Sequence, residues 1–312
     1  MSTTVLRTAD AWWVHTPAGA ARIDTDAVNT AQLLADAERI DAARASKQTV
    51  DPATLDLLSP VTAPCRVLAQ MTNFASHVKD SGLDPDTIPL TFFRKTSGSI
   101  SGPFEDIVRP AHVRFLDYEV EIGVVIAREL PVGTPVTADN WTSFVAGLVI
   151  TNDVSARDVQ LSKTQFFESK SYPTFTPVGP ALVLLDTDEL KRFGDLRLRL
   201  WVNGELRQDA VVDGDMIYSP LQALQALSRF QRLEPGDLLI TGTPDGTALS
   251  APPKPVEIIA AFLPPALKWR IFFKRQAHNP RYLTDGDVVE AAIGTDDAAL
   301  DLARQRTTVR SA

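Results

Sequence analysis

The sequence has almost no cysteine and no long apolar run. Its one cysteine, Cys65, cannot form an internal disulfide, and this predicts a reducing, cytoplasmic setting. No apolar stretch approaches the roughly 20 residues of a membrane-spanning helix. The first residues lack the basic segment and apolar core of a secretory signal. We therefore expect no membrane partner. Cys65 opens an apolar segment, which favours a core role over that of a nucleophile.

Positive charge is also in short supply. The chain of 312 residues has 31 lysines and arginines against 39 acidic residues, a net charge of −8. An acidic chain of this kind is not expected to bind nucleic acid. A small anionic substrate is still compatible with this balance, because it responds to local charge rather than to net charge.

Several catalytic signatures are missing. We find no G-x-G-x-x-G after a strand, no G-x-x-x-x-G-K-[ST], no G-x-S-x-G and no H-E-x-x-H. These absences argue against dinucleotide-binding enzymes, P-loop ATPases, α/β-hydrolases and zincins.

The first 60 residues differ from the rest. Alternating residues at 4–23 predict a β-hairpin that turns at "TPAG" (Thr16 to Gly19), and residues 29–45 predict a helix. Residues 55–64 are interrupted by prolines and indicate a linker. We therefore predict a small N-terminal α/β domain at 1–60 and a larger domain at 61–312.

Short strands dominate the larger domain. Helix signals are few, and the best is at 219–230, where Ser219 is the expected N-cap and Pro220 the first helical residue. Strands and helices do not alternate, which argues against a doubly wound parallel sheet. The expected fold class is α+β and β-rich, a mixed β-sheet roll or barrel. The strands are expected in "CRVLAQ", "YEVEIGVVI", "FVAGLVITND", "PALVLL", "LRLRLWVNG", "DLLITGTP" and "GDVVEAAI".

Residues 251–281 form an unusual basic and apolar segment. They hold six basic residues and one acidic residue, Glu257, and several prolines. We expect a loop that packs on the core or on a partner subunit. A substrate lid and a membrane-surface patch are alternatives, although the prolines oppose a long amphipathic helix.

The stretch "FLDYEVEIGVVI" places two carboxylates in an apolar strand. Glu119 and Glu121 are two residues apart and so face the same side of a strand. Like charges this close are unfavourable unless a positive group neutralises them. The alternative is an edge strand whose glutamates face solvent.

A third acid favours a metal site. Asp153 comes at the end of the apolar strand "FVAGLVITND", where functional side chains are often found. Three carboxylates without cysteine or clustered histidines suit a hard cation such as Mg²⁺ or Mn²⁺.

Three further features could belong to the same site. Lys170 precedes an aromatic, proline-bounded stretch, and Thr243 lies in a Gly-Thr-Pro turn that could bind an oxyanion. His77 and Asp80 are one helical turn apart and could act as a base with its orienting carboxylate. Each also has a simpler interpretation: a surface lysine, an ordinary turn and a solvated His/Asp pair.

Taken in order, these motifs resemble the fumarylacetoacetate hydrolase family. The resemblance spans about residues 70–250, with "LTDGDVVEAAI" as a closing strand. It implies a mixed β-sheet roll, a homodimer in most members and one Mg²⁺ or Mn²⁺ per subunit. The matching segments are "TNFASH", "FFRKTSGSISGP", "LDYEVEIGVVI", "GLVITNDVSARDVQ", "KSYPTFTPVGP" and "LLITGTPDGT".

The resemblance also implies roles for individual residues. It identifies His77 as the histidine of a mobile lid, which activates water in the hydrolytic members, with Asp80 as its partner. The implied metal ligands are Glu119, Glu121 and Asp153, and the implied substrate contacts are Lys170, Arg157, Gln160 and Thr243.

The chain departs from the family pattern in three places. Asn73-Phe74 stands where the small hydrolases usually have Asn-Tyr, and Asp80 stands where they often have glutamate. Residues 251–281 replace a shorter connection. The first two departures put the geometry of the His77–Asp80 pair in doubt, and the third could set specificity or assembly.

The resemblance implies three competing functions. The first is metal-dependent hydrolysis of a C–C bond in an acylpyruvate-like keto acid or other 1,3-dicarbonyl substrate, through a stabilised enolate. The second is a lyase, either an oxaloacetate-type decarboxylase or a 2-keto acid dehydratase or hydratase. The third is a non-catalytic or isomerising member. His77 with Asp80 favours hydrolysis, because hydrolysis needs an activated water.

Overall fold

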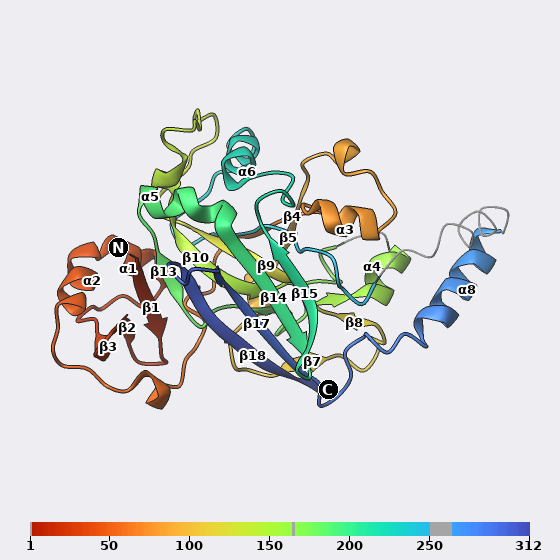
Figure 1. The fold of residues 1–312 in the computed structure, drawn as a ribbon, viewed down its shortest axis with the longest axis horizontal. Helices are drawn as coiled ribbons and strands as arrows, with labels where there is room; N and C mark the ends of the chain where they lie inside the picture. The colour runs from red at the N-terminus through yellow and green to blue at the C-terminus, as the bar shows by residue number, and fades with distance from the viewer. Residues whose placement is uncertain (1, 164–165, 250–263) are drawn as a thin grey trace.

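Two sheets packed face to face form the body of the protein. The computed structural model describes residues 2–163, 166–249 and 264–312. The larger sheet has nine strands in the order β3-β2-β1-β13-β10-β9-β16-β4-β5, and the smaller has five in the order β15-β14-β17-β18-β7. Strand β14 packs on β9, while β17 and β18 pack on β10 (Figure 1). The prediction of a β-rich mixed fold is confirmed.

The strands of the larger sheet come from distant parts of the chain. Neighbouring strands are antiparallel except β16 and β4, which are parallel. The sheet is therefore mixed. Its strands are β1 (Thr3–Arg7), β2 (Trp12–Thr16), β3 (Gly19–Arg22), β4 (Val67–Gln70), β5 (Phe92–Lys95), β9 (Val120–Ile126), β10 (Val145–Asn152), β13 (Leu182–Leu184) and β16 (Leu238–Ile240).

The smaller sheet closes the other side of the core. Its long strands alternate buried and exposed residues, because one face packs on the larger sheet and the other faces water. Its strands are β7 (Ile107–Arg109), β14 (Leu196–Val202), β15 (Glu205–Val211), β17 (Val288–Thr295) and β18 (Asp301–Ser311). Two short pairs complete the β-structure: β6 (Ile100–Ser101) with β12 (Thr176–Pro177), and β8 (Leu116–Asp117) with β11 (Ser155–Ala156).

The helices lie around the rim of the sheets. Helix α6 begins as expected, with Ser219 as N-cap and Pro220 as its first residue. The α-helices are α1 (Thr30–Ala35), α2 (Ala37–Arg44), α3 (Ala75–Asp80), α4 (Arg157–Lys163), α5 (Thr187–Leu190), α6 (Pro220–Leu227) and α8 (Pro265–Gln276). The 3-10 helices are η1 (Pro52–Thr54), η2 (Pro85–Thr87), η3 (Ser97–Ser99), η4 (Trp141–Phe144) and η5 (Lys191–Asp195). No helix among the described residues is long and apolar enough to cross a membrane.

The N-terminal segment shares the larger sheet. The expected hairpin is present as β2 and β3, and β1 joins them to the body by pairing with β13, with Val5 opposite Leu182. The single helix expected at 29–45 is wrong: the backbone leaves the helical region at Asp36, which separates α1 from α2. The division into domains at residue 60 stays a prediction.

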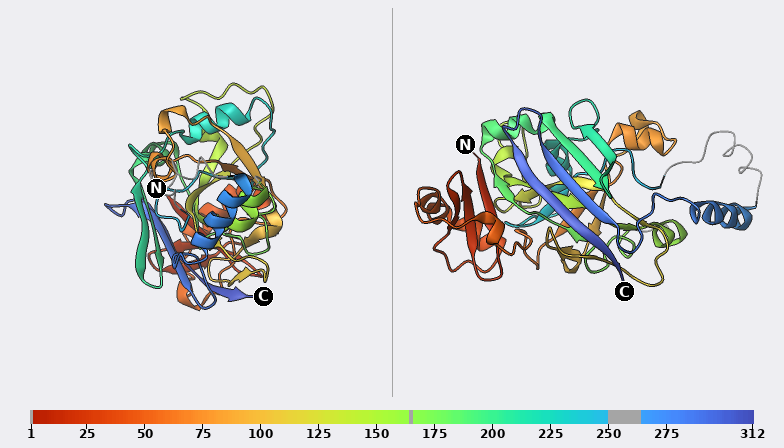
Figure 2. Two further views of the ribbon diagram at one scale, coloured as in Figure 1. Left: turned by 90° about the vertical axis from the view of Figure 1, so that its right-hand side faces the viewer. Right: turned by 60° about the horizontal axis from the view of Figure 1, so that its bottom comes forward.

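Helix α8 lies at the opposite end of the molecule from the N-terminal segment. Its first residues extend away from the body, and the right-hand view of Figure 2 shows it outside the sheets. Its last turn is attached to the body, since Phe273 stacks on Phe115 and Gln276 accepts a hydrogen bond from Tyr282. Residues 264–281 were expected to form a loop, so the helix corrects that part of the prediction. The rest of the predicted insertion, residues 251–263, lies outside the described residues.

The close approach of β10 and β13 requires a glycine. A Cβ at Gly147 would lie 2.1 Å from the backbone carbonyl oxygen of Val183. We predict that Gly147→Ala lowers the free energy of unfolding by about 3 kcal/mol or more, because neither strand can move without losing its pairing. Urea unfolding followed by circular dichroism measures this. Gly98→Ala, whose Cβ would meet nothing closer than 3.6 Å, is the control and should be nearly neutral.

Candidate active site

Three buried carboxylates meet where β9 and β10 lie side by side. Strand β9 is the sixth of nine strands and is entirely buried, so the alternative of an exposed edge strand is wrong. The antiparallel register pairs Asn152 with Val120, which places Asp153 opposite Glu119. The backbone N–H of Asp153 donates to the Glu119 carbonyl at 2.8 Å. Oxygen atoms of Glu119, Glu121 and Asp153 all lie within 4.8 Å of one another.

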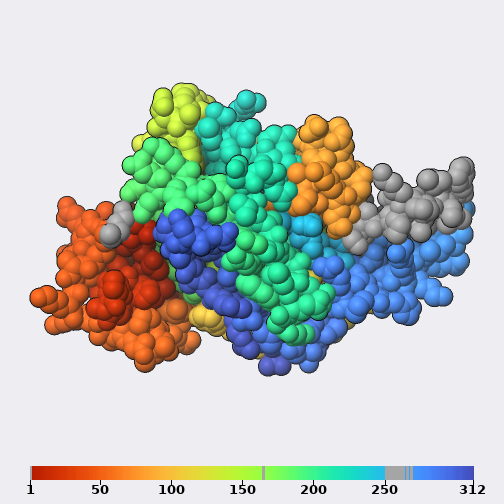
Figure 3. Space-filling view, viewed as in Figure 1, coloured from red at the N-terminus to blue at the C-terminus, as the bar shows by residue number. Residues whose placement is uncertain are grey.

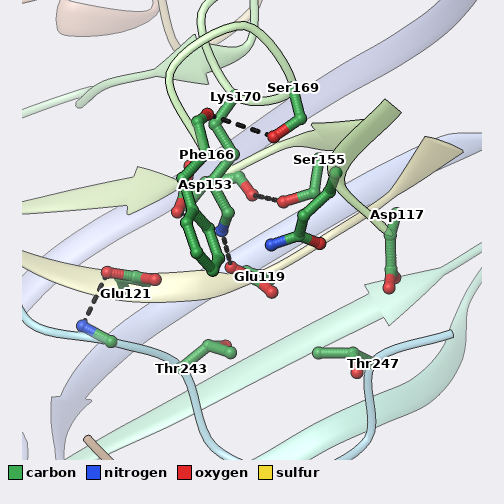
Figure 4. Close-up of polar contacts among 12 residues, drawn as sticks. Asp117, Glu119, Glu121, Asp153, Ser155, Phe166, Ser169, Lys170, Thr243 and Thr247 are labelled. Carbon is green, nitrogen blue, oxygen red and sulfur yellow. Dashed lines mark hydrogen bonds and ion pairs between the residues drawn. The ribbon is translucent and has the colours of Figure 1, made fainter. Parts of the chain in front are cut away.

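Two lysines and an arginine compensate part of this negative charge. Lys170 contacts both Glu119 and Asp153, while Lys95 contacts Asp153 and donates to the Phe175 carbonyl at 2.8 Å. Figure 4 shows Lys170 reaching toward Glu119 and Asp153. Lys170 is therefore no surface lysine: it is buried inside the carboxylate cluster.

Arg157 fixes the other side of Glu119. It contacts Glu119 through Nη2, donates to Asp117 through Nε at 2.8 Å, and donates to Gln160 Oε1 through Nη1 at 2.9 Å. All its nitrogens thus have protein partners. In this structure Arg157 braces a carboxylate of the cluster, and the role in substrate binding implied by the resemblance stays a prediction for it and for Gln160.

Glu121 is the carboxylate that the protein leaves without a cation. Among the described residues no lysine or arginine forms an ion pair with it, and its Oε2 accepts from the Gly242 N–H at 2.7 Å. Burial raises its pKa, and the neighbouring Asp153 and Glu119 carboxylates raise it further, well above the ordinary value. For Glu119, burial alone would raise the pKa, but Arg157 and Lys170 outweigh it and the pKa is lowered.

This donor set fits a hard divalent cation. Three clustered carboxylates supply oxygen ligands, and one of them, Glu121, lacks a positive partner. Mg²⁺ and Mn²⁺ bind through a few carboxylates and fill their remaining positions with water or substrate oxygens. Glu119, Glu121 and Asp153 are therefore placed to hold one such ion.

Helix α3 covers the cluster with His77. This residue, Phe93, Phe166 and the carboxylates line one cavity of about 60 Å³. Nδ1 of His77 is buried and has no hydrogen-bond partner. Burial lowers the pKa of His77, and Glu119 only partly opposes this, so the ring is neutral at pH 7. Figure 3 shows the α3 segment, in orange, on the surface beside the loop that follows β15.

The predicted pairing of His77 with Asp80 is not formed as a hydrogen bond. Nδ1 of His77 has no partner, and Asp80 is exposed at the end of α3. Burial raises the pKa of Asp80 above its ordinary value. Asp80 therefore does not orient the His77 ring in this structure.

Gln208, which the sequence analysis did not identify, supports the Gly-Thr-Pro turn through hydrogen bonds. Gln208, on β15, donates to Thr243 Oγ1 at 2.8 Å and to the Pro244 carbonyl at 2.9 Å. The Thr243 hydroxyl itself donates to the Val120 carbonyl at 2.9 Å. Thr243 lines the cavity, but its hydroxyl proton is already used. The predicted contact with a substrate carboxylate therefore remains untested.

Other functional residues were also missed. Lys95 lies within the quoted segment "FFRKTSGSISGP", yet nothing local distinguishes it from its exposed neighbour Arg94. Asp117 lies in the quoted stretch "FLDYEVEIGVVI". Its carboxylate accepts hydrogen bonds from Arg157 and from the N–H groups of Ala248 and Leu249. Both depend on partners distant in sequence. No pattern along the chain could have identified them.

The comparisons with known proteins agree with this geometry. The model of the fumarylacetoacetate (FAA) hydrolase C-terminal domain matches residues 66–310. The chain belongs to the fumarylacetoacetate hydrolase family.

Relatives within this family carry different activities in their names. The chain is 36% identical over 197 residues to the mitochondrial oxaloacetate tautomerase Fahd2a of Rattus norvegicus, covering 63% of this chain and 61% of that protein. It is 35% identical over 226 residues to 2,4-didehydro-3-deoxy-L-rhamnonate hydrolase of a Sphingomonas species, covering 70% and 77%. The match thus spans under two thirds of the tautomerase.

Solved structures share the whole fold. A probable 2-hydroxyhepta-2,4-diene-1,7-dioate isomerase from Mycobacterium abscessus superposes with a TM-score of 0.75 at 28% identity, over 100% of this chain and 99% of that one. A fumarylacetoacetate hydrolase from Exiguobacterium antarcticum has a TM-score of 0.70 at 26% identity, over 100% of each chain. The homologues are enzymes. The expected homodimer stays a prediction.

Glu121 offers a direct test of the metal site. We predict that Glu121→Gln weakens Mn²⁺ binding at least about 100-fold in isothermal titration calorimetry, because one of three anionic ligands is lost. The metal-free variant should unfold at the same temperature as the wild type or higher, because the substitution removes a repelled carboxylate. Glu290→Gln, a charge change on β17, is the control. Unchanged Mn²⁺ affinity in Glu121→Gln would exclude the site.

Proposed function

We propose that this enzyme interconverts the keto and enol forms of a small 2-oxo acid that carries a second carbonyl two carbons away. The observation that supports this most is the unpartnered, neutral His77 nitrogen in the same cavity as the carboxylate cluster and Lys170. A proton carrier, a fixed positive charge and a cation site in one cavity are what enolisation of a carbonyl requires.

The cation we propose is Mg²⁺ or Mn²⁺, held by Glu119, Glu121 and Asp153. When bound, it polarises the carbonyl and stabilises the negative charge of an enolate. The cavity is small, about 60 Å³. We therefore propose a small acid, such as oxaloacetate, rather than one with a long acyl chain.

Lys170 supplies fixed positive charge. Burial lowers its pKa, but Asp153 and Glu119 outweigh burial and the pKa lies above the ordinary value. Lys170 therefore stays an ammonium group, and we assign it to stabilise the oxygen on which negative charge develops. A lysine held in this form does not act as a base.

His77 carries the proton. Its neutral ring takes a proton from the carbon between the two carbonyls, and the electron pair of that C–H bond moves onto the carbonyl oxygen. The imidazolium then returns the proton to that oxygen, which gives the enol. The reverse sequence gives the keto form, so no atom is gained or lost. The aromatic rings of Phe93 and Phe166, stacked with centroids 5.1 Å apart, form a dry wall of the cavity.

Hydrolysis of a C–C bond is the second candidate. It uses the same enolate but needs in addition a water aimed at the second carbonyl. In its favour, Asp80 lies one turn after His77 on α3, and the Sphingomonas relative is named a hydrolase. We place it second because Asp80 does not hold the His77 ring and because the cavity is small.

Product analysis by NMR separates these reactions. With Mg²⁺ or Mn²⁺ in D₂O, we predict enzyme-dependent exchange of the protons between the carbonyls of oxaloacetate and of 2,4-dioxopentanoate, lost with EDTA. Acetate and pyruvate from 2,4-dioxopentanoate would establish hydrolysis instead. Carbon dioxide from oxaloacetate above the metal-only rate would establish decarboxylation. Absence of all three would contradict the proposal.

The role of His77 predicts a defined pH dependence. Because burial lowers its pKa, and a bound cation lowers it further, the base is active above that pKa and lost as pH falls through it. The acid limb of kcat/KM should therefore lie below the ordinary value for histidine. His77→Asn should lose at least about 100-fold in kcat and lose this limb. His15→Asn, an exposed histidine on β2, should change neither.

A further inference from the structure

The helix that carries His77 has no side-chain cap of its own. Helix α3 has only six residues, and Phe74, at its N-cap, accepts no hydrogen bond through its side chain. A helix this short is not stable by itself in water, and the N–H groups of its first turn have no partners within the helix. The first turn, in which His77 is the third residue, therefore depends on contacts from outside the helix.

Asp215, in the loop between β15 and α6, supplies the missing cap. Its backbone carbonyl accepts from the Ala75 N–H at 2.7 Å. Its carboxylate accepts from the Ser76 N–H at 2.7 Å and from the Ser76 hydroxyl at 2.6 Å. The Ser76 hydroxyl oxygen in turn accepts from the Asp245 N–H at 3.2 Å, in the Gly-Thr-Pro turn. One charged residue, 139 positions after Ser76, thus fixes the start of α3.

The chain on either side of this first turn is anchored in other ways. Asn73 Nδ2 donates to the Tyr218 carbonyl at 2.9 Å, and its Oδ1 accepts from the Tyr218 N–H at 2.8 Å. Phe74 and Val78 are fully buried in the core. Loss of the Asp215 carboxylate would therefore loosen the first turn of α3 and leave the surrounding fold in place. Figure 3 shows α3 beside the loop that contains Asp215.

We propose that Asp215 is a positioning residue, which keeps His77 beside the carboxylate cluster by capping the helix on which His77 lies. The inference rests on the proposed function, in which His77 carries the proton. His77 follows Ser76 directly and lines the cavity, so the bonds that fix Ser76 also fix the backbone that carries the imidazole. Without this cap the first turn frays, and the ring spends less time beside the carboxylates.

Kinetics of three variants test the proposal. With Mn²⁺ present, Asp215→Ala should lower kcat for the tautomerisation of oxaloacetate about tenfold and change KM by less than about twofold. Asp215→Asn keeps an acceptor oxygen for the Ser76 N–H and should stay within about threefold of the wild-type kcat. Asp213→Ala removes an exposed carboxylate from the same loop, and it should behave as the wild type. A wild-type kcat in Asp215→Ala would overturn the proposal.

The pH profile distinguishes positioning from a simple loss of folded enzyme. Burial is the largest cause of the lowered pKa of His77. The charges that also act on this ring are those of Glu119, Arg157, Lys170 and Asp117. A frayed first turn exposes the ring, so the acid limb of kcat/KM should move to higher pH in Asp215→Ala. A smaller folded fraction would lower the rate equally at every pH. A reduced kcat with an unshifted limb would therefore contradict the proposed role.

NMR titration of the metal-free protein separates this inference from the proposed reaction. The chain has four histidines, and the His77 signal is identified by its absence from His77→Asn. Its pKa should lie below the ordinary value in the wild type and in Asp213→Ala, and should rise toward about 6.5 in Asp215→Ala. If the wild type shows no turnover, the proposed function fails, but this titration still decides the role of Asp215. Equal pKa values in the wild type and Asp215→Ala would overturn it.

A milder substitution keeps the test decisive if Asp215→Ala does not fold. Ser76→Ala removes the hydroxyl bond to the Asp215 carboxylate and keeps the Ser76 N–H bond. The pKa of His77 should therefore rise in this variant by less than in Asp215→Ala. An unchanged pKa in Ser76→Ala, with no folded Asp215→Ala for comparison, would overturn the proposal.

Discussion

Repulsion among three buried carboxylates is the constraint on which the rest of the site depends. Oxygen atoms of Glu119, Glu121 and Asp153 lie within 4.8 Å of one another, and all three residues are buried. Such a cluster is unstable without compensating positive charge. The fold supplies Lys170, Lys95 and Arg157 from three separate segments, and these neutralise two of the carboxylates directly. Among the described residues, Glu121 has no lysine or arginine partner, and it is therefore available to bind a metal cation.

The same charge arrangement divides the chemistry among the side chains. Lys170, held between two carboxylates, stays protonated. His77 stays neutral because burial lowers its pKa more than Glu119 raises it. A fixed charge and a proton carrier therefore lie side by side at the same pH. The N-terminal segment and α8 lie at the two ends of the molecule, and none of their described residues lines the cavity.

The sequence predicted those features of the site that depend on residues close together along the chain. Two glutamates at strand spacing and an aspartate at a strand exit indicated the cluster, because their neighbours along the chain determine where they point. Lys95 and Gln208 could not be found in this way, since their roles come from Asp153 and Thr243, which lie 58 and 35 residues away. Helix α8 was missed because prolines precede its last three turns, and the break at Asp36 because good helix formers surround it.

A crystal structure of the protein soaked with Mn²⁺, with anomalous diffraction data, tests the metal site most directly. We predict one strong anomalous peak within about 2.0–2.6 Å of oxygen atoms from Glu119, Glu121 and Asp153. We also expect the Lys170 ammonium group to withdraw from at least one of its carboxylates when the ion binds. A peak elsewhere, or none at a saturating concentration, would contradict the metal site, because the buried carboxylates would then be compensated by the protein alone.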